Sequence, residues 1–348
     1  MEWIFMVMSF QKISYHDLSN WLGEKTTFYD KILLITFIHC SRLDAGKFPL
    51  GGRSMPKFAV VSDSCVDLPL KVAQKLDLNV VPMIVTIDDK TYRNFLDERE
   101  ITTAKFNEFL KNKAKPKTSQ PAPQEVMDVV EPLLKAGQDV LLMSISSNLS
   151  QTFNSMNVAK TELKEKYPKR RIELFDTLNA SLGEGLLVHK ALLLKNEEKT
   201  MDETLAYLNS IRNKVVAVVA FDDLSHLLRG GRINAAKFAL GSVLGIKPVL
   251  ICNSEGRIVP VPKLKLRGRK NALNFLLETF KKYVEQDDSV FIVHSDSADD
   301  AKFLGEELKK IRPGIKTLLT NTMGPVIGAH GGLGTIGIMF VGKTKDIE

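Results

Sequence analysis

The sequence predicts an α/β protein with two α/β domains, the first with a parallel sheet and the second with a mixed sheet. From residue 55 to residue 213, short apolar segments alternate with amphipathic helical patterns, which is typical of parallel β-α units. Residues 214–348 are less regular, and a turn sequence at residues 253–256 between two apolar segments indicates a hairpin. The length of 348 residues agrees with two domains of roughly 150 residues each.

The apolar patterns also predict where the individual elements lie. Strands are expected at residues 58–62, 80–87, 140–145, 172–175, 215–221, 247–251, 258–262, 290–294, 317–319 and 335–340. Helices are expected at residues 103–111, 123–134, 150–166 and 182–195, and again from about residue 270 to residue 283. The sequence Ser181-Leu182-Gly183-Glu184 has the form of a capping box at the start of one of these helices.

Composition excludes several classes of protein. The chain is 44% hydrophobic and 26% charged, and its net charge of +7 permits a basic docking face without requiring nucleic acid. The cysteines, Cys40, Cys65 and Cys252, are odd in number and far apart, which argues against a disulfide framework and favours a reducing cytoplasm. No apolar segment reaches the ~20 residues of a membrane helix, and no signal peptide is recognisable. We therefore expect a cytoplasmic protein without an integral membrane segment.

Residues 1–54 differ from the rest of the chain and are interpreted as an appendage of unknown role. They contain both tryptophans and no domain pattern, and the glycine-containing sequence at residues 51–54 precedes a fresh strand pattern. A shortened chain that begins at Met55 is expected to fold.

Two hydroxyl-rich segments indicate a site for an anion. Thr118 and Ser119 lie just before Pro121 and Pro123, which predicts that both hydroxyls lie beside the free amides at the start of a helix. The alternative interpretation is a simple helix cap. Ser146 and Ser147 belong to a second segment of the same kind, residues 144–152.

His330 is a candidate partner for these hydroxyls. It lies between Gly328 and Gly331, and glycines on both sides permit a close approach of the backbone to a ligand. The alternative is a histidine that is bonded to the backbone of a turn.

Several motifs together resemble one known family. They are Asp63-Ser64-Cys65-Val66-Asp67-Leu68-Pro69, Thr118-Ser119-Gln120-Pro121-Ala122-Pro123, Ile145-Ser146-Ser147-Asn148-Leu149-Ser150, Leu228-Arg229-Gly230-Gly231-Arg232-Ile233, Gly245-Ile246-Lys247-Pro248, Arg267-Gly268-Arg269-Lys270 and His330-Gly331-Gly332-Leu333-Gly334. From about residue 55 to its end the chain resembles the DegV family of bacterial fatty-acid-binding proteins. It departs from the family pattern at Gln151, where Gly is usual, and at Leu333, where Pro is usual.

The resemblance implies that two α/β domains enclose one long-chain fatty acid in a tunnel between them. It also implies that the carboxylate is held by Thr118, Ser119, Ser146, Ser147 and His330. No cofactor is implied beyond the bound acid. Some members of the family present the acid to a separate kinase subunit, which forms the acyl phosphate.

The implied ligand is chemically reasonable for these residues. A fatty acid carboxylate is ionised at neutral pH, given a reference pKa of about 4.3 for a Glu carboxyl. Its burial requires partners, which hydroxyls, helix amides and an imidazolium would provide. The tail requires an apolar tunnel, for which Ile84, Ile246, Val249 and Ile327 are candidate lining residues as well as ordinary core residues.

Two alternatives belong to other classes of site. Ser146 or Ser147 with His330 as base would make a serine esterase acting on lipid esters, although the Gly-x-Ser-x-Gly sequence is absent. Asp63 and Asp67 could suggest a metal site, but the spacing before Pro69 favours a turn and helix cap.

The basic residues Arg229, Arg232, Arg267 and Arg269 lie beside glycines in two segments. They could form a solvated face. Alternatively, they could project outward and dock an acidic partner, for which a fatty acid kinase is the candidate that the resemblance implies.

Overall fold

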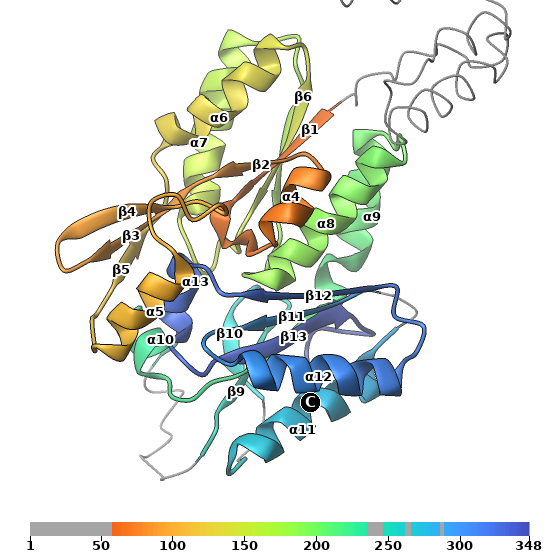
Figure 1. The fold of residues 1–348 in the computed structure, drawn as a ribbon. Coiled ribbons are helices and arrows are strands. Elements are labelled where there is room, and N and C mark those ends of the chain that lie inside the picture. The colour runs from red at the N-terminus through yellow and green to blue at the C-terminus, as the bar shows by residue number, and fades with distance from the viewer. Residues whose placement is uncertain (1–57, 235–245, 262–265, 286–288, 348) are drawn as a thin grey trace, which may run out of the picture. The chain divides into compact units, whose positions relative to one another are not determined.

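The computed structural model describes residues 58–234, 246–261, 266–285 and 289–347, and it has the α/β architecture that the sequence predicts (Figure 1). The predicted appendage, residues 1–54, lies outside these ranges. Among the described residues, no helix is both long enough and apolar enough to cross a membrane.

The first sheet is parallel throughout. Its strands have the order β2 (Leu78–Val81), β1 (Phe58–Asp63), β6 (Asp139–Ser144) and β7 (Ile172–Asp176). Two helices, α6 (Pro123–Lys135) and α7 (Thr152–Lys166), contribute to one hydrophobic cluster with residues of this sheet. The short helix α4 (Leu70–Lys75) follows the 3-10 turn η2 (Ser64–Val66) after β1.

The six-stranded sheet is mixed. Its strands have the order β10 (Ile258–Pro260), β9 (Val249–Cys252), β8 (Val215–Ala220), β13 (Ile336–Val341), β11 (Ser289–His294) and β12 (Thr317–Thr322). Only β11 and β12 are parallel neighbours; the other neighbours are antiparallel. The helices α11 (Arg269–Tyr283) and α12 (Ala298–Ile311) lie against one face of this sheet (Figure 1).

One helix packs between these two sheets. The helix α8 (Leu182–Asn196) contacts β1 of the parallel sheet and β8, β11 and β13 of the mixed sheet. Its side chains are apolar on nearly every side, and Leu186, Leu187 and Ala191 are fully buried. A helix that is apolar all round is typical of a position inside the core. The neighbouring helix α9 (Met201–Ile211) begins with a capping box between Thr200 and Glu203.

A third, antiparallel sheet was not expected. It consists of β4 (Lys90–Asn94), β3 (Met83–Ile87) and β5 (Lys117–Ser119). The single strand predicted for residues 80–87 is therefore two strands in different sheets. They separate at Pro82, which has no N–H to donate to a strand partner.

Three further helices complete the described fold. The helix α5 (Thr103–Lys111) begins after Thr102, whose hydroxyl accepts from the amide of Lys105. The helix α10 (Ser225–Arg229) contacts α13 (Pro325–Gly331), which also contacts β3 and β5. The helix α13 therefore connects the C-terminal part of the chain to the small antiparallel sheet.

Residues 56–348 form one compact unit. The predicted domain boundary between residues 213 and 214 falls in the 3-10 turn η3 (Arg212–Lys214), just before the first strand of the mixed sheet. That boundary stays a prediction.

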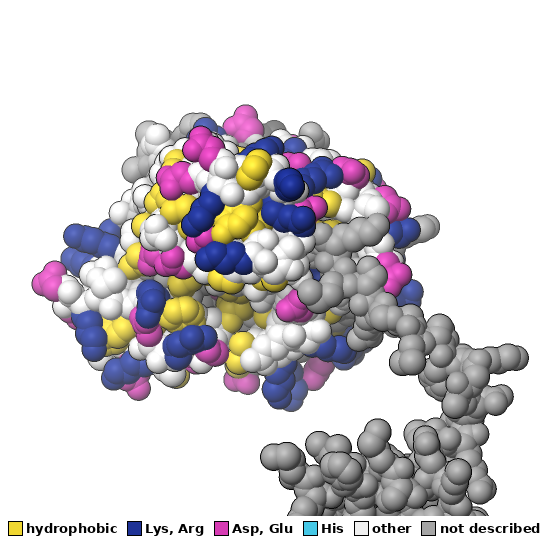
Figure 2. Space-filling view, turned by 90° about the horizontal axis from the view of Figure 1, so that it is seen from above, with side chains coloured by type: hydrophobic (Ala, Val, Ile, Leu, Met, Phe, Trp, Pro, Cys, Tyr) yellow, Lys and Arg dark blue, Asp and Glu magenta, His cyan; other side chains and the backbone are white. Residues whose placement is uncertain are grey.

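One face of the molecule carries charges of both signs. Figure 2 shows Lys and Arg side chains interspersed with Asp and Glu side chains and apolar patches, without a large continuous area of one sign. A groove that tracks a phosphate backbone would instead be lined by positive charge. This face therefore does not have the pattern of a nucleic-acid-binding surface.

Candidate functional site

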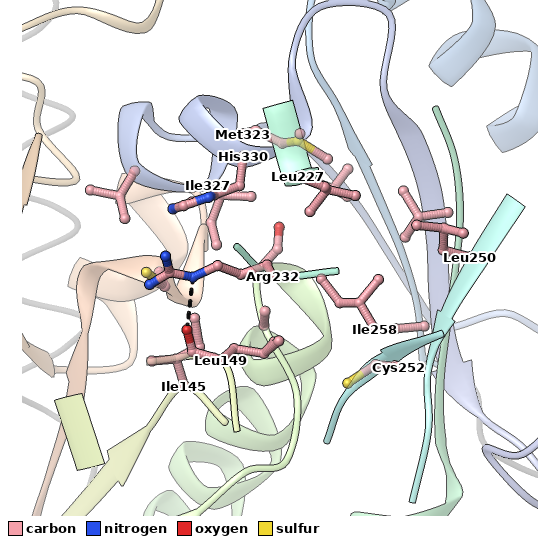
Figure 3. A pocket seen from close by; sticks show the side chains of 18 of the residues that line it. Ile145, Leu149, Leu227, Arg232, Leu250, Cys252, Ile258, Met323, Ile327 and His330 are labelled. Atoms are coloured by element: carbon pink, nitrogen blue, oxygen red, sulfur yellow. Dashed lines mark hydrogen bonds between the residues drawn. The ribbon is translucent and has the colours of Figure 1, made fainter. Parts of the chain in front are cut away.

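A largely apolar pocket is lined by strands of the mixed sheet, by β3 and β5, by the helices α10 and α13, and by segments that follow strands of the parallel sheet (Figure 3). The space within it, together with its mouth, is about 870 Å³. Ligand pockets in proteins are mostly apolar with a few polar groups. The apolar lining residues include Met83, Ile145, Leu149, Leu227, Leu250, Ile258, Met323, Val326, Ile327 and Met339.

Polar side chains are few in this lining, and two of them are directly bonded. The hydroxyl oxygen of Thr118 lies 2.7 Å from Nε2 of His330. Thr118 pairs with the buried Val85 across β5 and β3, and His330 lies in the last turn of α13. The two sequence-predicted residues therefore meet at the pocket, although they come from segments that are distant in sequence.

His330 is fixed by close packing. An added Cβ at Gly230 would overlap Nδ1 of the imidazole, so only glycine permits this approach. Nδ1 is buried and has no hydrogen-bond partner among the described residues. Burial, followed by the positive charge of Arg232 and then His226, lowers the pKa of His330 to about 4. The ring is therefore neutral at pH 7, whereas the sequence suggested an imidazolium, because a buried cation is costly.

Arg232 lies in the pocket lining. Its Nε donates to the carbonyl of Leu149 at 3.0 Å, and its guanidinium also donates to the carbonyl of Gly230 (Figure 3). Arg232 also lines two grooves that adjoin the pocket. The guanidinium is half-buried, which lowers its pKa, but arginine stays charged at neutral pH. Its inward position differs from the outward orientation that the glycines around it suggested.

Ser150 is a further polar lining residue. It follows Leu149, and its hydroxyl lies 2.8 Å from that of Thr152 at the start of α7. Neither Ser150 nor Arg232 was assigned to the carboxylate from the sequence. Both belong to motifs that the sequence analysis singled out, but spacing along the chain does not show which of several neighbouring side chains faces a cavity.

Ser119 lies outside the pocket. It is exposed and follows Thr118 in β5, where successive side chains point to opposite faces. The predicted helix begins only at Pro123, after the amide of Ala122 donates to Glu125. The hydroxyls of residues 118 and 119 therefore lie in a strand and not at the helix start, because the chain before each proline stays extended.

Ser146 and Ser147 are not among the lining residues. The buried Ser146 hydroxyl donates to the carbonyl of Gly256 at 2.8 Å. The side chain of Asn148 donates to the neighbouring carbonyl of Glu255. These two side chains therefore hold the β9–β10 turn, while Ser147 uses its backbone amide to donate to Asp176.

The other three arginines that the sequence suggested for partner docking differ in their exposure. Arg269 is turned toward the protein, where it pairs with Asp300 and Asp222 and donates to the carbonyl of Gly334. Arg229 and Arg267 are exposed. The guanidinium of Arg229 lies 3.0 Å from Nδ1 of His226 in the preceding turn.

Among the candidate tunnel residues, Ile327 lines the pocket, whereas Ile84, Ile246 and Val249 are not among the lining residues.

Asp63, the last residue of β1, caps the turn that follows it, whereas α4 begins after Pro69 without the side-chain cap that the sequence suggested. Asp63 accepts from the amides of Cys65 and Ile145, which confirms the interpretation as a turn cap. Burial raises the pKa of Asp63 to about 6 and that of Asp67 to about 7. The described part of the chain contains no group of three or more metal-ligating side chains.

The amino-acid sequence is similar to those of proteins of one family. A model of one protein family, described as an uncharacterised protein of the DegV family, matches residues 57–343. A DegV domain-containing protein of Clostridium perfringens is 37% identical over 294 residues, covering 84% of this chain and 100% of the relative. One of Lactococcus lactis is 33% identical over 291 residues, covering 82% and 98%.

Solved structures show the same architecture. A DegV family protein of Thermus thermophilus, described by its fatty acid binding, superposes with a TM-score of 0.73 at 31% identity, covering 81% of this chain and 98% of that one. DegV of Bacillus subtilis, described as a fatty acid binding protein, gives a TM-score of 0.69 at 30% identity, covering 81% and 98%.

Proposed function

The chain belongs to the DegV family, and we propose that it binds one long-chain fatty acid in the pocket, with the carboxylate at Thr118 and His330. The observation that carries the proposal is the 2.7 Å contact between these two side chains at the wall of a largely apolar pocket. Solved relatives described as fatty-acid-binding proteins support the class of ligand.

Four side chains are proposed to hold the carboxylate. Thr118 and Ser150 supply hydroxyl donors, Arg232 supplies a charge, and His330 supplies a ring nitrogen. A hydrogen bond to an ionised partner is roughly twice as strong as a neutral one. Since Arg232 is the one permanently charged group among the described lining residues, we assign it most of the charge compensation. Ser119, Ser146 and Ser147 are not needed for this arrangement.

The tail is proposed to extend from this end along the mixed sheet. Leu250 and Ile258 lie on the side of the pocket away from His330 (Figure 3). Burial of a methylene contributes ~0.8 kcal/mol, so a long chain would supply most of the affinity while the polar end fixes its direction.

We also propose that the bound acid is presented to a separate kinase, which forms the acyl phosphate. This step rests on the family resemblance. The exposed Arg229 and Arg267 are the proposed docking residues, because their guanidinium groups suit an acidic partner. In an assay with a cognate kinase, a doubly reversed R229E/R267E protein should bind fatty acid normally and support acyl-phosphate formation poorly at physiological salt.

A cytoplasmic location is part of the proposal. It is supported by the free thiols of Cys65 and Cys252 in the described chain, which fit a reducing compartment.

Native mass spectrometry of the purified protein tests the function directly. A co-purified acyl chain of one stoichiometric equivalent is expected. After delipidation, titration with hexadecanoate should restore the same complex. If the protein instead releases alcohol from a chromogenic acyl ester, and this turnover disappears with Ser147→Ala or His330→Gln, the esterase interpretation replaces the present one.

A further inference from the structure

Asp67 is a fully buried carboxylate that joins three parts of the chain. It follows η2 after β1 and is only 2% exposed. One carboxylate oxygen accepts from the amide of Gly324 at 2.9 Å, and the other accepts from the Ser181 hydroxyl at 2.6 Å. Its own backbone carbonyl accepts from the side chain of Asn321 at 2.8 Å. The partners lie 114 to 257 positions away in sequence.

The bond to Gly324 fixes the start of α13. Gly324 is the residue before this helix, and α13 carries His330 in its last turn. Because α13 is a single short helix of 7 residues, a shift of its first residue is transmitted to His330. The same helix contributes Val326 and Ile327 to the pocket lining.

The bond to Ser181 fixes a second part of the pocket wall. Ser181 lines the pocket and precedes α8. The sequence suggested that the Ser181 side chain caps this helix. It does not, because its hydroxyl donates to the carboxylate of Asp67 instead. Ser181 and Asp67 both have left-handed φ values, 54° and 45°. Non-glycine residues keep such conformations only where their surroundings hold them in place, and they cluster at functional sites.

We propose that Asp67 is a positioning residue for the carboxylate end of the pocket. Its two bonds hold the start of α13 and Ser181 in fixed positions relative to each other. The proposal rests on the proposed function, because it assumes that His330 contacts the head group of a fatty acid. Asp67 itself does not line the pocket, so it acts through the residues that it holds.

A neighbouring residue provides a matched control. Asp63 is likewise fully buried and is the last residue of the same strand. It accepts from the amides of Cys65 and Ile145, both in the first part of the chain, and among the described residues it has no bond to α13. Removal of either carboxylate therefore perturbs the chain that follows β1. Of the two changes, however, it is the removal of Asp67 that deletes a hydrogen bond to the start of α13, the helix that carries His330.

The experiment compares two ligands with the same tail. Binding of hexadecanoate and hexadecanol is measured by calorimetry for the wild-type protein and the variants Asp67→Ala, Asp67→Asn and Asp63→Ala. Asp67→Ala should lose about tenfold more affinity for the acid than for the alcohol, which corresponds to one charge-assisted hydrogen bond. Asp67→Asn, which retains an acceptor for Gly324, should bind both ligands nearly as the wild type does. Asp63→Ala should weaken both ligands equally.

The outcomes separate the two proposals. If the wild type binds neither ligand, the proposed function fails. If the wild type binds the acid but Asp67→Ala weakens acid and alcohol by the same factor, Asp67 is only structural and the inference is wrong. Should Asp67→Ala not fold, Ser181→Ala removes one of the two bonds, and the proposal then requires a smaller but still acid-selective loss.

Discussion

The hydroxyl of Thr118 and Nε2 of His330 lie 2.7 Å apart although the residues are separated by 212 positions. Different elements place the two side chains. Thr118 is placed by the pairing of β5 with β3, and His330 is placed by α13 and by its contact with Gly230. A ligand carboxylate at this pair would find a hydroxyl and an imidazole that are already oriented, which reduces the entropy cost of binding.

The first prediction concerns Thr118. The variant Thr118→Val keeps the shape of the side chain but removes the hydroxyl, so the affinity for hexadecanoate should fall by about 0.5–1.5 kcal/mol. Calorimetric titration measures the change. The control is Thr86→Val in the same small sheet, which removes an exposed hydroxyl contact to Thr91. Equal affinities of the two variants would contradict the assignment of Thr118.

The second prediction concerns Gly230. In Gly230→Ala the new Cβ would lie 2.7 Å from Cε1 of His330 and would overlap Nδ1, so the ring must move. Fatty acid binding should weaken strongly while the protein stays folded. The control is Gly231→Ala, where no atom lies within 4 Å but φ is +71°. That variant should lose ~1–2 kcal/mol of stability from the left-handed backbone and retain binding. Unchanged binding in Gly230→Ala would show that the ring position does not matter.

The main architecture was predictable from local patterns. The parallel sheet with its helices follows from alternating apolar and amphipathic segments, and the turn at residues 253–256 does form the β9–β10 hairpin. These features depend on periodicity within short segments, which a sequence displays directly.

The third sheet was not predictable in the same way. The strand β5 has only 3 residues, and its partner β3 lies more than thirty positions away. No short-range pattern distinguishes such a segment from an extended chain before a helix. Tertiary pairing therefore decides its structure, as is common for short strands.

The candidate site was predicted only in part. Thr118 and His330 were assigned to one site, and the structure brings them together. Ser146 was assigned to the same site, but its hydroxyl holds the carbonyl of Gly256. Arg232 was interpreted as a docking residue and lines the pocket. The direction of a side chain depends on the loop conformation around it, which motif spacing does not show.

The third prediction concerns the β9–β10 turn. Ser146→Ala should lower the free energy of unfolding by about 1–3 kcal/mol, because the buried carbonyl of Gly256 loses its donor. Urea denaturation measures this. The control is Ser147→Ala, whose half-buried hydroxyl has no such bond and whose loss should change stability by less than ~0.5 kcal/mol. Equal losses in both variants would mean that the Ser146 bond does not hold the turn.

The fourth prediction concerns the pH dependence of stability. Burial raises the pKa of Asp67 to about 7 in the folded protein, above its ordinary value of 3.8. Between these values the folded state binds a proton that the unfolded state does not. The free energy of unfolding should therefore increase as the pH falls from about 8 to about 5, relative to Asp67→Asn, which has no such proton. Urea denaturation of both proteins across this range measures the difference, and parallel pH profiles would contradict the prediction.

The last prediction concerns proton uptake during binding. Burial and the charges of Arg232 and His226 lower the pKa of His330 to about 4, so the ring is neutral at pH 6. A bound carboxylate is an opposite charge and would raise this pKa, so the complex should bind a fraction of a proton that the free protein does not. By linkage, the affinity for hexadecanoate should increase as the pH falls from about 7, until the ligand itself is protonated below a pH of about 5.

Calorimetry at pH 6 in buffers with different ionisation enthalpies measures this proton directly. The binding enthalpy of hexadecanoate should change with the buffer, and that of hexadecanol should not. The variant His330→Gln retains a partner for Thr118 but cannot titrate, so it should remove the buffer dependence of hexadecanoate binding. A buffer dependence that persists in His330→Gln would assign the proton to another group, and its absence in the wild type would show that the carboxylate does not contact His330.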